Sequence, residues 1–248
     1  MPGTTPKSIE TRRLYQQVAD QIRSVIETGA YRVGSRLPPE RELALQLGVS
    51  RPSLREALIA LEIDGRVEIR MGSGVYVCAP PVAANRSTPA LGESPIELMQ
   101  ARAALEGAVV TLAAARVTPA GLARVGDSLA AMKREHARGL TPVGADRRFH
   151  LGIAEMTGNT VLVRMVGELF DGRHGPLSSR MSGRSETVQT WTTALVEHER
   201  IFRALESRDP QAAAAAMCSH LLASEERWLA GPDGAVASPT TSASKEHP

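Results

Sequence analysis

The chain of 248 residues is long enough for two modest domains, each with a hydrophobic core of its own. Aromatic residues make up only 3% of it while alanine and leucine are abundant, which argues against a β-sandwich and favours packed helices. The net charge of +2 excludes no class of partner, but residues 1–78 hold 11 basic and 9 acidic residues and the remainder balances at 18 of each. The small basic excess therefore lies in the first third, where nucleic-acid contact and a solvated face are both compatible with it.

Cysteine usage and hydropathy indicate a cytoplasmic protein. Cys78 and Cys218 lie far apart and outside any CxxC spacing, so neither a disulfide framework nor a cysteine zinc site is expected. The first residues, MPGTTPKSIETRR, lack the apolar segment of a signal peptide. No run approaches the roughly 18 apolar residues that a membrane helix requires. We therefore expect no contact with a membrane.

Composition divides the chain into two periodic regions. Residues 1–10 and 231–248 are rich in Pro, Gly, Ser and Thr, which predicts disordered tails. Residues 79–95 (APPVAANRSTPALGESP), which follow Cys78, have the composition of a linker. The sequence thus predicts an N-terminal domain over 11–78 and a C-terminal domain over 96–230.

Three helices are predicted at the start of the first region. Apolar residues recur at helical spacing from Leu14 to Ile26, and the stretch RLPPERELALQLG predicts a second helix that begins at Glu40 and ends at Gly48. The stretch VSRPSLREALIALEIDG predicts a third helix with Ser50 as its N-cap. The buried side of this third helix is predicted to consist of Leu54, Leu58 and Leu61. The second and third helices, joined by a tight turn that contains glycine, make a helix-turn-helix.

A short β-hairpin is predicted directly after the third helix. The segment RVEIRMGSGVYV alternates apolar and polar residues on both sides of Gly72-Ser73-Gly74. A hairpin at this place is a wing. The first region is therefore predicted to be a winged helix-turn-helix DNA-binding domain.

Basic and hydroxyl side chains gather at the start of the third helix, on the side opposite the leucines. Arg51 and Arg55 lie one turn apart and can bind guanine edges or phosphates, and Ser50 and Ser53 can donate to backbone oxygens. Arg41 can reach the adjoining DNA backbone. The alternative is a solvated surface on which these arginines pair with the nearby carboxylates Glu40, Glu42 and Glu56.

The second region predicts an antiparallel bundle of helices. No strand alternation interrupts it, and such a bundle forms its sites in the interior, between facing helices. Six helical segments are predicted, over residues 95–117, 119–138, 142–157, 159–173, 187–207 and 210–229.

Four residues of the second region have the chemistry of a metal site. Asp146 and His150 are at i and i+4 and face the same way on one helix, while His198 and His220 lie among apolar residues on two later helices. One carboxylate and three imidazoles suit a divalent ion such as Zn²⁺, Ni²⁺ or Mn²⁺, with positions left open for water or a ligand oxygen. The alternative for each histidine is a hydrogen-bonded core residue. His136, on the charged stretch KREHAR, is predicted to be solvated.

Both regions resemble a known family of regulators. The stretch RLPPERELALQLGVSRPSLREALIALEIDGRVEIRMGSGVYV resembles the winged helix of the GntR family. The second region resembles the FCD ligand-binding domain of the FadR subfamily through RAALE at 102–106, DRRFH at 146–150, TGN at 157–159 and the two later histidines. The two matches together cover nearly everything except the tails.

The resemblance implies roles for the residues of the winged helix. Arg41, Arg51 and Arg55 match the DNA-contacting arginines of the family, and the wing tip around Gly72 is implied to enter the minor groove. The family member with the best-known wing has His where this chain has Met71, so the resemblance implies no base preference at that position.

In the FCD domain the resemblance supports the metal set named above and adds residues that bind an effector. An arginine at the place of Arg102 tends to hold the carboxylate of the effector, although pairing with Glu106 is the alternative. Asn159 can supply an amide to the same ligand or only cap its helix. His174 can line the cavity or cap a helix end.

These observations predict a bacterial transcription regulator and not an enzyme. The expected protein is a homodimer that binds a palindromic operator, and most simply a repressor, with a divalent metal and a small carboxylic acid in its C-terminal domain. Two alternatives remain at this point. One is a metal-dependent enzyme on the helical domain, for which no carboxylate is an obvious general base. The other is a metal sensor without an organic effector.

Overall fold

The computed structural model describes residues 13–79 and 91–230. The tails predicted for residues 1–10 and 231–248 lie outside the described residues, as does most of the linker predicted for 79–95. The fold is mainly helical with one small hairpin, which confirms the fold class predicted from the sequence.

Contacts group the described residues into two compact units. The first holds the residues up to Ala101 together with Glu168–Arg180, and the second holds Arg102–Gly167 and the residues from Met181 on. The helix α4 (Pro95–Ala114) begins in the first unit and continues into the second. The domain boundaries predicted from composition stay a prediction.

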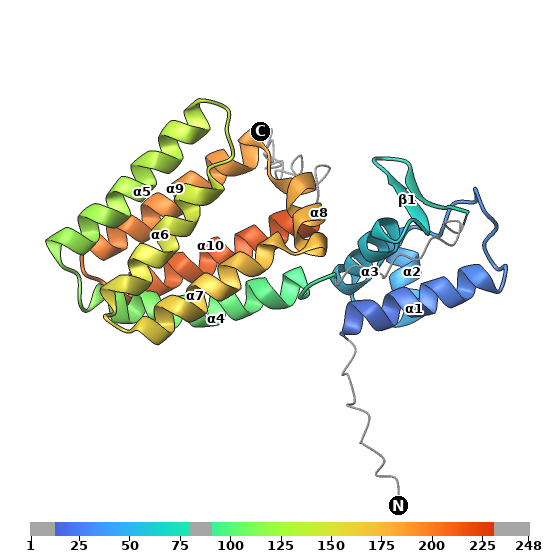
Figure 1. Ribbon diagram of the computed structural model, residues 1–248, viewed down its shortest axis with the longest axis horizontal. Helices are drawn as coiled ribbons and strands as arrows, with labels where there is room; N and C mark the ends of the chain where they lie inside the picture. The colour runs from blue at the N-terminus through green and yellow to red at the C-terminus, as the bar shows by residue number, and fades with distance from the viewer. Residues whose placement is uncertain (1–12, 80–90, 231–248) are drawn as a thin grey trace, which may run out of the picture. The chain divides into compact units, whose positions relative to one another are not determined.

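The first unit contains the predicted winged helix-turn-helix. Its elements are α1 (Leu14–Glu27), α2 (Glu40–Leu47), α3 (Arg51–Ile63), β1 (Val67–Arg70) and β2 (Gly74–Val77), as Figure 1 shows. The three leucines predicted to be buried on α3 are at most 1% exposed. They join Val18 and Ile22 of α1 and Val75 of β2 in one apolar cluster. The core of the unit therefore lies between the helices and the hairpin.

Local chemistry sets the bounds of the two helices in the helix-turn-helix. Gly48 ends α2 in the left-handed region, with φ of 65°, where a side chain would be strained. Ser50 caps α3 by accepting a hydrogen bond from the Ser53 backbone N–H at 3.2 Å. Pro52 in the first turn costs no helical hydrogen bond. The tight turn and the N-cap predicted here are both confirmed.

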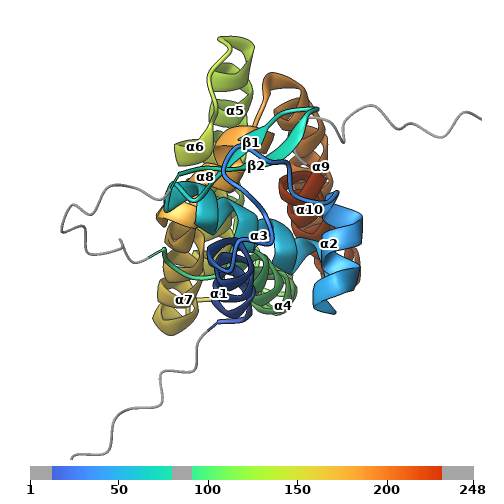
Figure 2. The same ribbon diagram turned by 90° about the vertical axis from the view of Figure 1, so that its right-hand side faces the viewer.

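The wing is a two-stranded antiparallel sheet extended by a third segment. β1 pairs with β2 in the register Val67 to Val77 and Arg70 to Gly74, and both strands are labelled in Figure 2. On the other edge of β2, Leu37 N–H donates to the Val75 carbonyl at 2.8 Å. The loop before α2 therefore covers an edge that would otherwise expose unpaired backbone groups.

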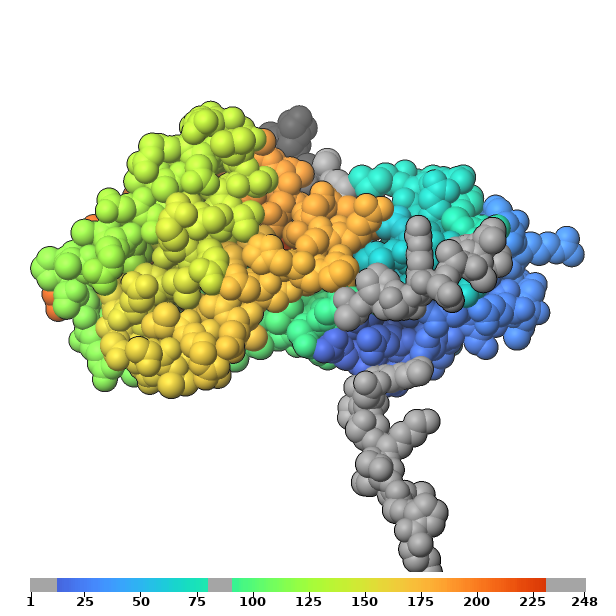
Figure 3. Space-filling model, in the orientation of Figure 1, coloured from blue at the N-terminus to red at the C-terminus, as the bar shows by residue number. Residues whose placement is uncertain are grey.

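The second region folds into helices throughout the part of the chain that the structure describes. After α4 come α5 (Pro119–Ala137), α6 (Val143–Met156), α7 (Thr160–Asp171), α8 (Pro176–Ser185), α9 (Val188–Glu206) and α10 (Pro210–Ala230). In the second unit α5 lies against α6 and α9, and α9 lies against α10. The space-filling view shows the side chains of α5 and α6 in continuous contact on one face (Figure 3). None of the described helices is long and apolar enough to cross a membrane.

One helix was missed by the sequence prediction. The helix α8, with the sequence PLSSRMSGRS, lies between the helices predicted over residues 159–173 and 187–207. Its serines and glycine are weak helix formers, so propensity gives little signal. Burial of Leu177 and Met181, four residues apart on one face, stabilises it instead.

Candidate functional site

The start of α3 presents the arginines that are predicted to read DNA. Arg51 is exposed and Arg55 is partly buried, one turn apart, while Leu54 and Leu58 are fully buried on the other side. Arg41, at the start of α2, is exposed. Within residues 13–79 and 91–230, neither Arg41 nor Arg51 forms an ion pair. Their charges are therefore available to solvent or to a polyanion.

Two of the three carboxylates considered as partners for these arginines have other partners. Glu56 is 3% exposed, and its Oε1 accepts hydrogen bonds from Ser94 Oγ at 2.7 Å and from the Ile96 backbone N–H at 3.0 Å. Glu42 Oε1 accepts from Gln46 Nε2 at 3.1 Å. Within the described part of the chain, these carboxylates do not neutralise Arg41 or Arg51. The contacts of Arg41, Ser50, Arg51, Ser53 and Arg55 with DNA stay predictions.

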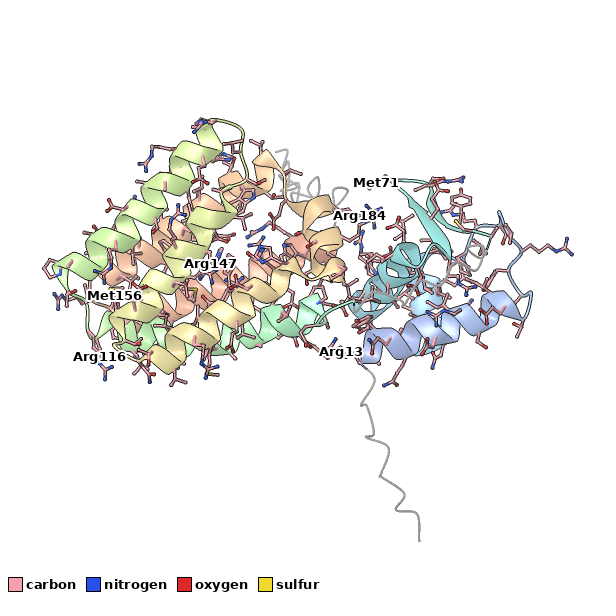
Figure 4. All side chains as sticks on the ribbon, viewed as in Figure 1. Arg13, Met71, Arg116, Arg147, Met156 and Arg184 are labelled. Atoms are coloured by element: carbon pink, nitrogen blue, oxygen red, sulfur yellow. The ribbon has the colours of Figure 1, made fainter. Side chains whose placement is uncertain are left out.

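The tip of the wing consists of residues that allow another molecule to approach the backbone closely. Gly72 adopts φ of 65°, in the region that favours glycine, and Met71 beside it is 58% exposed at the tip of the hairpin (Figure 4). Ser73 Oγ and the Tyr76 hydroxyl lie 2.8 Å apart and link the turn to β2. The exposed tip suits entry into a groove, and the predicted contact at Gly72 belongs with the other DNA predictions.

The second unit brings all four predicted metal ligands together. Asp146 and His150 lie one turn apart on α6, His198 lies on α9 and His220 lies on α10. All four are buried, with at most 5% of each residue exposed. One ligand atom from each lies within 4.8 Å of the others. We call these four residues the ligand cluster, and it could hold a metal ion.

In two of the three rings, Nε2 is the nitrogen that faces Asp146. His198 Nε2 lies 2.8 Å from Asp146 Oδ1, and His150 Nε2 lies 3.4 Å from the same oxygen. The ring centroids of His198 and His220 are 4.2 Å apart. Rings this close, directed at one carboxylate, form a compact set of nitrogen and oxygen donors of the kind that binds borderline divalent ions.

The opposite nitrogen of every ring is engaged outside the cluster. His150 Nδ1 bonds Glu106 Oε2 at 2.5 Å, His198 Nδ1 bonds the Ala194 carbonyl at 2.7 Å, and His220 Nδ1 bonds a carboxylate of α9 at 2.8 Å. Histidines that bind metals nearly always donate their other ring N–H to such an acceptor. This arrangement favours a metal site over a set of ordinary core histidines.

Burial and neighbouring charges set the protonation of the cluster. Burial alone would raise the pKa of the Asp146 carboxyl, but His150 and His198 outweigh it and hold that pKa well below its usual range. Burial alone would lower the pKa of His150, whereas Glu106 and Asp146 raise it to about 9. Burial and then His198 lower the pKa of His220 to about 3. A metal ion entering the cluster would displace the proton on His150.

The structure places Arg102 beside Glu106, which is the pairing considered as the alternative. Arg102 is 5% exposed, and its Nε donates to Glu106 Oε1 at 2.7 Å. Burial alone would raise the pKa of Glu106, but Arg102 and His150 outweigh it and lower the pKa to about 2. The Glu106 carboxylate therefore stays ionised, and it connects Arg102 to the ligand cluster. Contact between Arg102 and an effector stays a prediction.

The other two predicted effector residues lie at helix ends. Asn159 is exposed, and its Oδ1 accepts from the backbone N–H groups of Val161 and Leu162 at the start of α7. His174 is exposed, and its Nδ1 bonds the Asp171 carbonyl at 3.0 Å. The structure shows the capping contacts that were considered for both residues. Their contact with an effector stays a prediction.

The sequence prediction missed the role of two glutamates. Glu106 was considered only as a partner of Arg102, and Glu197 was not singled out. Glu197 Oε2 bonds His220 Nδ1 at 2.8 Å, and both oxygens of Glu197 accept from Arg227. The sequence signal that could have found these glutamates is a carboxylate on an otherwise apolar helical face. Glu197 directly precedes His198 in the chain, and Glu106 directly precedes Gly107.

Two family models match the chain. Residues 14–77 match the model described as "Bacterial regulatory proteins, gntR family", and residues 97–223 match the FCD domain. The first match covers the winged helix-turn-helix, and the second covers every residue of the ligand cluster.

Similar proteins support the same assignment. The chain is 37% identical over 222 residues to the Exu regulon transcriptional regulator of Escherichia coli (strain K12), covering 86% of this chain and 83% of that protein. It is 36% identical over 225 residues to the Uxu operon transcriptional regulator of the same strain, covering 88% of each. The solved structure of E. coli McbR/YncC has a TM-score of 0.50 and 22% identity over 88% of this chain and 98% of that one, and so shares the fold.

These matches decide between the classes considered from the sequence. The relatives are transcription regulators, which places the chain among regulators and not among enzymes. The chain belongs to the GntR family of bacterial regulatory proteins, as a DNA-binding transcription regulator that joins a winged helix-turn-helix to an FCD domain in the manner of the FadR subfamily.

Proposed function

We propose that the protein is a homodimeric repressor that binds a palindromic operator and releases it when a small organic acid binds beside a divalent metal in the FCD domain. The observation that carries this proposal is the ligand cluster, with one buried carboxylate and three imidazoles within 4.8 Å. An ion that takes more than four ligands, held by these four donors, has coordination positions left over for a ligand oxygen. An effector that binds at these free coordination positions could regulate DNA binding through the C-terminal domain.

The donor set limits the identity of the metal. Nitrogen and carboxylate donors without a thiolate suit Zn²⁺, Ni²⁺ or Mn²⁺. Asp146 and the three Nε2 atoms would hold the ion, and the ion would supply a Lewis-acidic centre for a carboxylate oxygen of the effector. The outer partners of the rings hold the donors in place before the ion arrives.

An acid is the class of effector that the charges favour. Arg102 is a buried cation, and its partner Glu106 also contacts His150. An effector carboxylate that binds Arg102 would therefore lie near the metal ligands. The names of the relatives refer to an Exu regulon, a Uxu operon and, at 30% identity, an L-lactate dehydrogenase operon. Sugar acids, hydroxy acids and dicarboxylates are therefore the panel to test.

The proposed response is a shift between two conformational populations. An acid that binds the DNA-incompetent state more tightly must weaken operator binding by the ratio of its two affinities. Arg51 and Arg55 on α3 are proposed to contact bases or phosphates, with Arg41 and the wing tip at Gly72 on the adjoining backbone and groove.

Thermal melting in the presence of a panel of acids tests the proposal. A ligand that binds only the native state raises the melting temperature, so the effector should do so in metal-loaded protein and not after chelation. The same acid should then raise the Kd for operator DNA in a fluorescence anisotropy titration.

Other outcomes of this experiment are equally informative. DNA affinity that follows metal alone, and that neither any acid nor Arg102→Ala alters, would make the ion itself the signal. Melting curves that neither metal nor acid moves would remove the regulatory role proposed for the ligand cluster.

A further inference from the structure

One histidine of the ligand cluster is held by a carboxylate that an arginine holds in turn. His150 Nδ1 bonds Glu106 Oε2, and Glu106 Oε1 accepts from Arg102 Nε at 2.7 Å. The side chains of Arg102 and Glu106 are 6% and 2% exposed, so water contributes little to holding them. We call these three residues the inner relay.

A second relay of the same composition approaches the cluster from other helices. His220 Nδ1 bonds Glu197 Oε2 at 2.8 Å, while Arg227 Nη1 and Nη2 donate to Glu197 Oε1 and Oε2 at 2.7 and 2.8 Å. The bidentate pairing fixes the plane of the carboxylate. The side chains of Glu197 and Arg227 are 12% and 19% exposed. We call these three residues the outer relay.

The Nδ1 of the third histidine is held without a carboxylate. His198 Nδ1 bonds the Ala194 carbonyl one turn earlier on α9, and the ring packs edge to face with Phe149 at a centroid distance of 4.9 Å and an interplanar angle of 84°. Outside the ligand cluster, its orientation is fixed by backbone and packing. The two relays therefore act on His150 and His220, which lie on α6 and α10.

We propose that Glu106 and Glu197 are the positioning residues of the metal centre, each braced by its arginine, and that they set the affinity and geometry of the bound ion. This inference rests on the proposed function, in which the ligand cluster holds a divalent metal. Neither glutamate touches the ion. Each fixes the rotation of an imidazole ring and keeps a hydrogen on Nδ1, so that Nε2 is the atom presented to the metal.

Two physical effects make the relays matter for affinity. A ring held in its binding orientation loses less freedom when the ion arrives. A carboxylate at Nδ1 also makes the opposite nitrogen a stronger donor. Loss of such an outer partner typically weakens metal binding by roughly 10–100-fold. The arginines contribute through the carboxylates, so their removal should have a smaller effect.

Titration of the metal-free, full-length protein with Co²⁺ tests the proposal, because the visible absorption of Co²⁺ reports both occupancy and ligand geometry. Glu197→Leu removes charge and acceptor, whereas Glu197→Gln removes the charge but keeps an acceptor oxygen for His220. We expect Kd to rise roughly 10–100-fold for the leucine variant and less for the glutamine variant, with an altered spectrum for leucine. Glu106→Gln tests the inner relay in the same way.

Glu199→Gln is the matched control, because Glu199 lies on the same helix and pairs with Lys133 at the surface. It removes the same charge and should leave both Kd and the spectrum unchanged. Wild-type Kd and spectrum in Glu197→Leu and Glu106→Gln would overturn the positioning role while leaving the metal site intact. A wild-type protein that binds no Co²⁺ would instead overturn the proposed function itself.

Discussion

His198 is the ligand whose Nδ1 is held by the backbone and not by a carboxylate. Its Nε2 lies 2.8 Å from Asp146 Oδ1 and its Nδ1 is fixed by the backbone. We predict that His198→Ala weakens metal binding by more than the roughly 10–100-fold typical for loss of an outer partner, because the substitution removes a donor atom itself. Metal content after dialysis measures this. His136→Ala, at a histidine that contacts Thr192 outside the cluster, should retain wild-type metal content.

Arg51 is the residue at which DNA binding can be tested most directly. It is exposed at the first position of α3 and makes no ion pair within the described part of the chain. If Arg51 reads guanine, Arg51→Ala should reduce the binding free energy by about 1–3 kcal/mol and relax the specificity at one base pair. If Arg51 binds a phosphate, binding should weaken equally for all DNA sequences, and the slope of log K against log salt concentration should fall by about 1 in magnitude. Operator titrations at several salt concentrations distinguish the two, and Arg134→Ala on α5 should change neither.

At the scale of elements, the wing depends on a glycine that faces a guanidinium. Gly74 has φ of 116°, and a Cβ there would lie 2.5 Å from Arg36 Nε. We predict that Gly74→Ala lowers the free energy of unfolding by roughly 1–3 kcal/mol, as expected for a side chain forced into this region. Gly183→Ala in α8, where no atom lies within 4 Å of the new Cβ, should raise it by up to about 1 kcal/mol. Chemical denaturation of both variants measures the contrast.

The start of α4 is tied to α3 by a buried carboxylate. Glu56 accepts from Ser94 Oγ and from the Ile96 backbone N–H, and it is 3% exposed. Glu56→Ala leaves these two donors without their acceptor, so we predict a loss of about 1–3 kcal/mol in stability. Glu42→Ala, at an exposed carboxylate of α2, should change stability by less than about 0.5 kcal/mol. Equal losses in the two variants would contradict the role of Glu56.

At the scale of the whole molecule, two compact units predict a metal effect confined to one of them. The ligand cluster lies entirely in the second unit. Metal at about 100 times its Kd should stabilise that unit by about 2.7 kcal/mol. In calorimetry, the transition of the second unit should move up with metal and return after chelation, while that of the winged helix-turn-helix stays in place. A metal-dependent shift of the DNA-binding transition instead would contradict this assignment.

Much of the fold could be predicted because it is encoded locally. The apolar spacing in α1 and α3, the Ser50 cap and the glycines of the wing all act within a few residues of each other. The helix α8 could not be predicted in this way, because burial of Leu177 and Met181 in the folded chain outweighs its weak propensity. Glu56, considered from sequence as a surface partner of arginines, is buried against Ser94 for the same reason.

The metal site divides between what the sequence determined by itself and what only the tertiary structure decided. The sequence determined that Asp146 and His150 share a helical face, because a separation of four residues is one turn, and it marked His198 and His220 as polar residues on apolar faces. Only the packing of α6, α9 and α10 decided that their donor atoms meet within 4.8 Å. It also decided that Glu106 and Glu197 hold two of the rings, since contacts between residues far apart in the chain arise from helix packing and have no periodicity to reveal them.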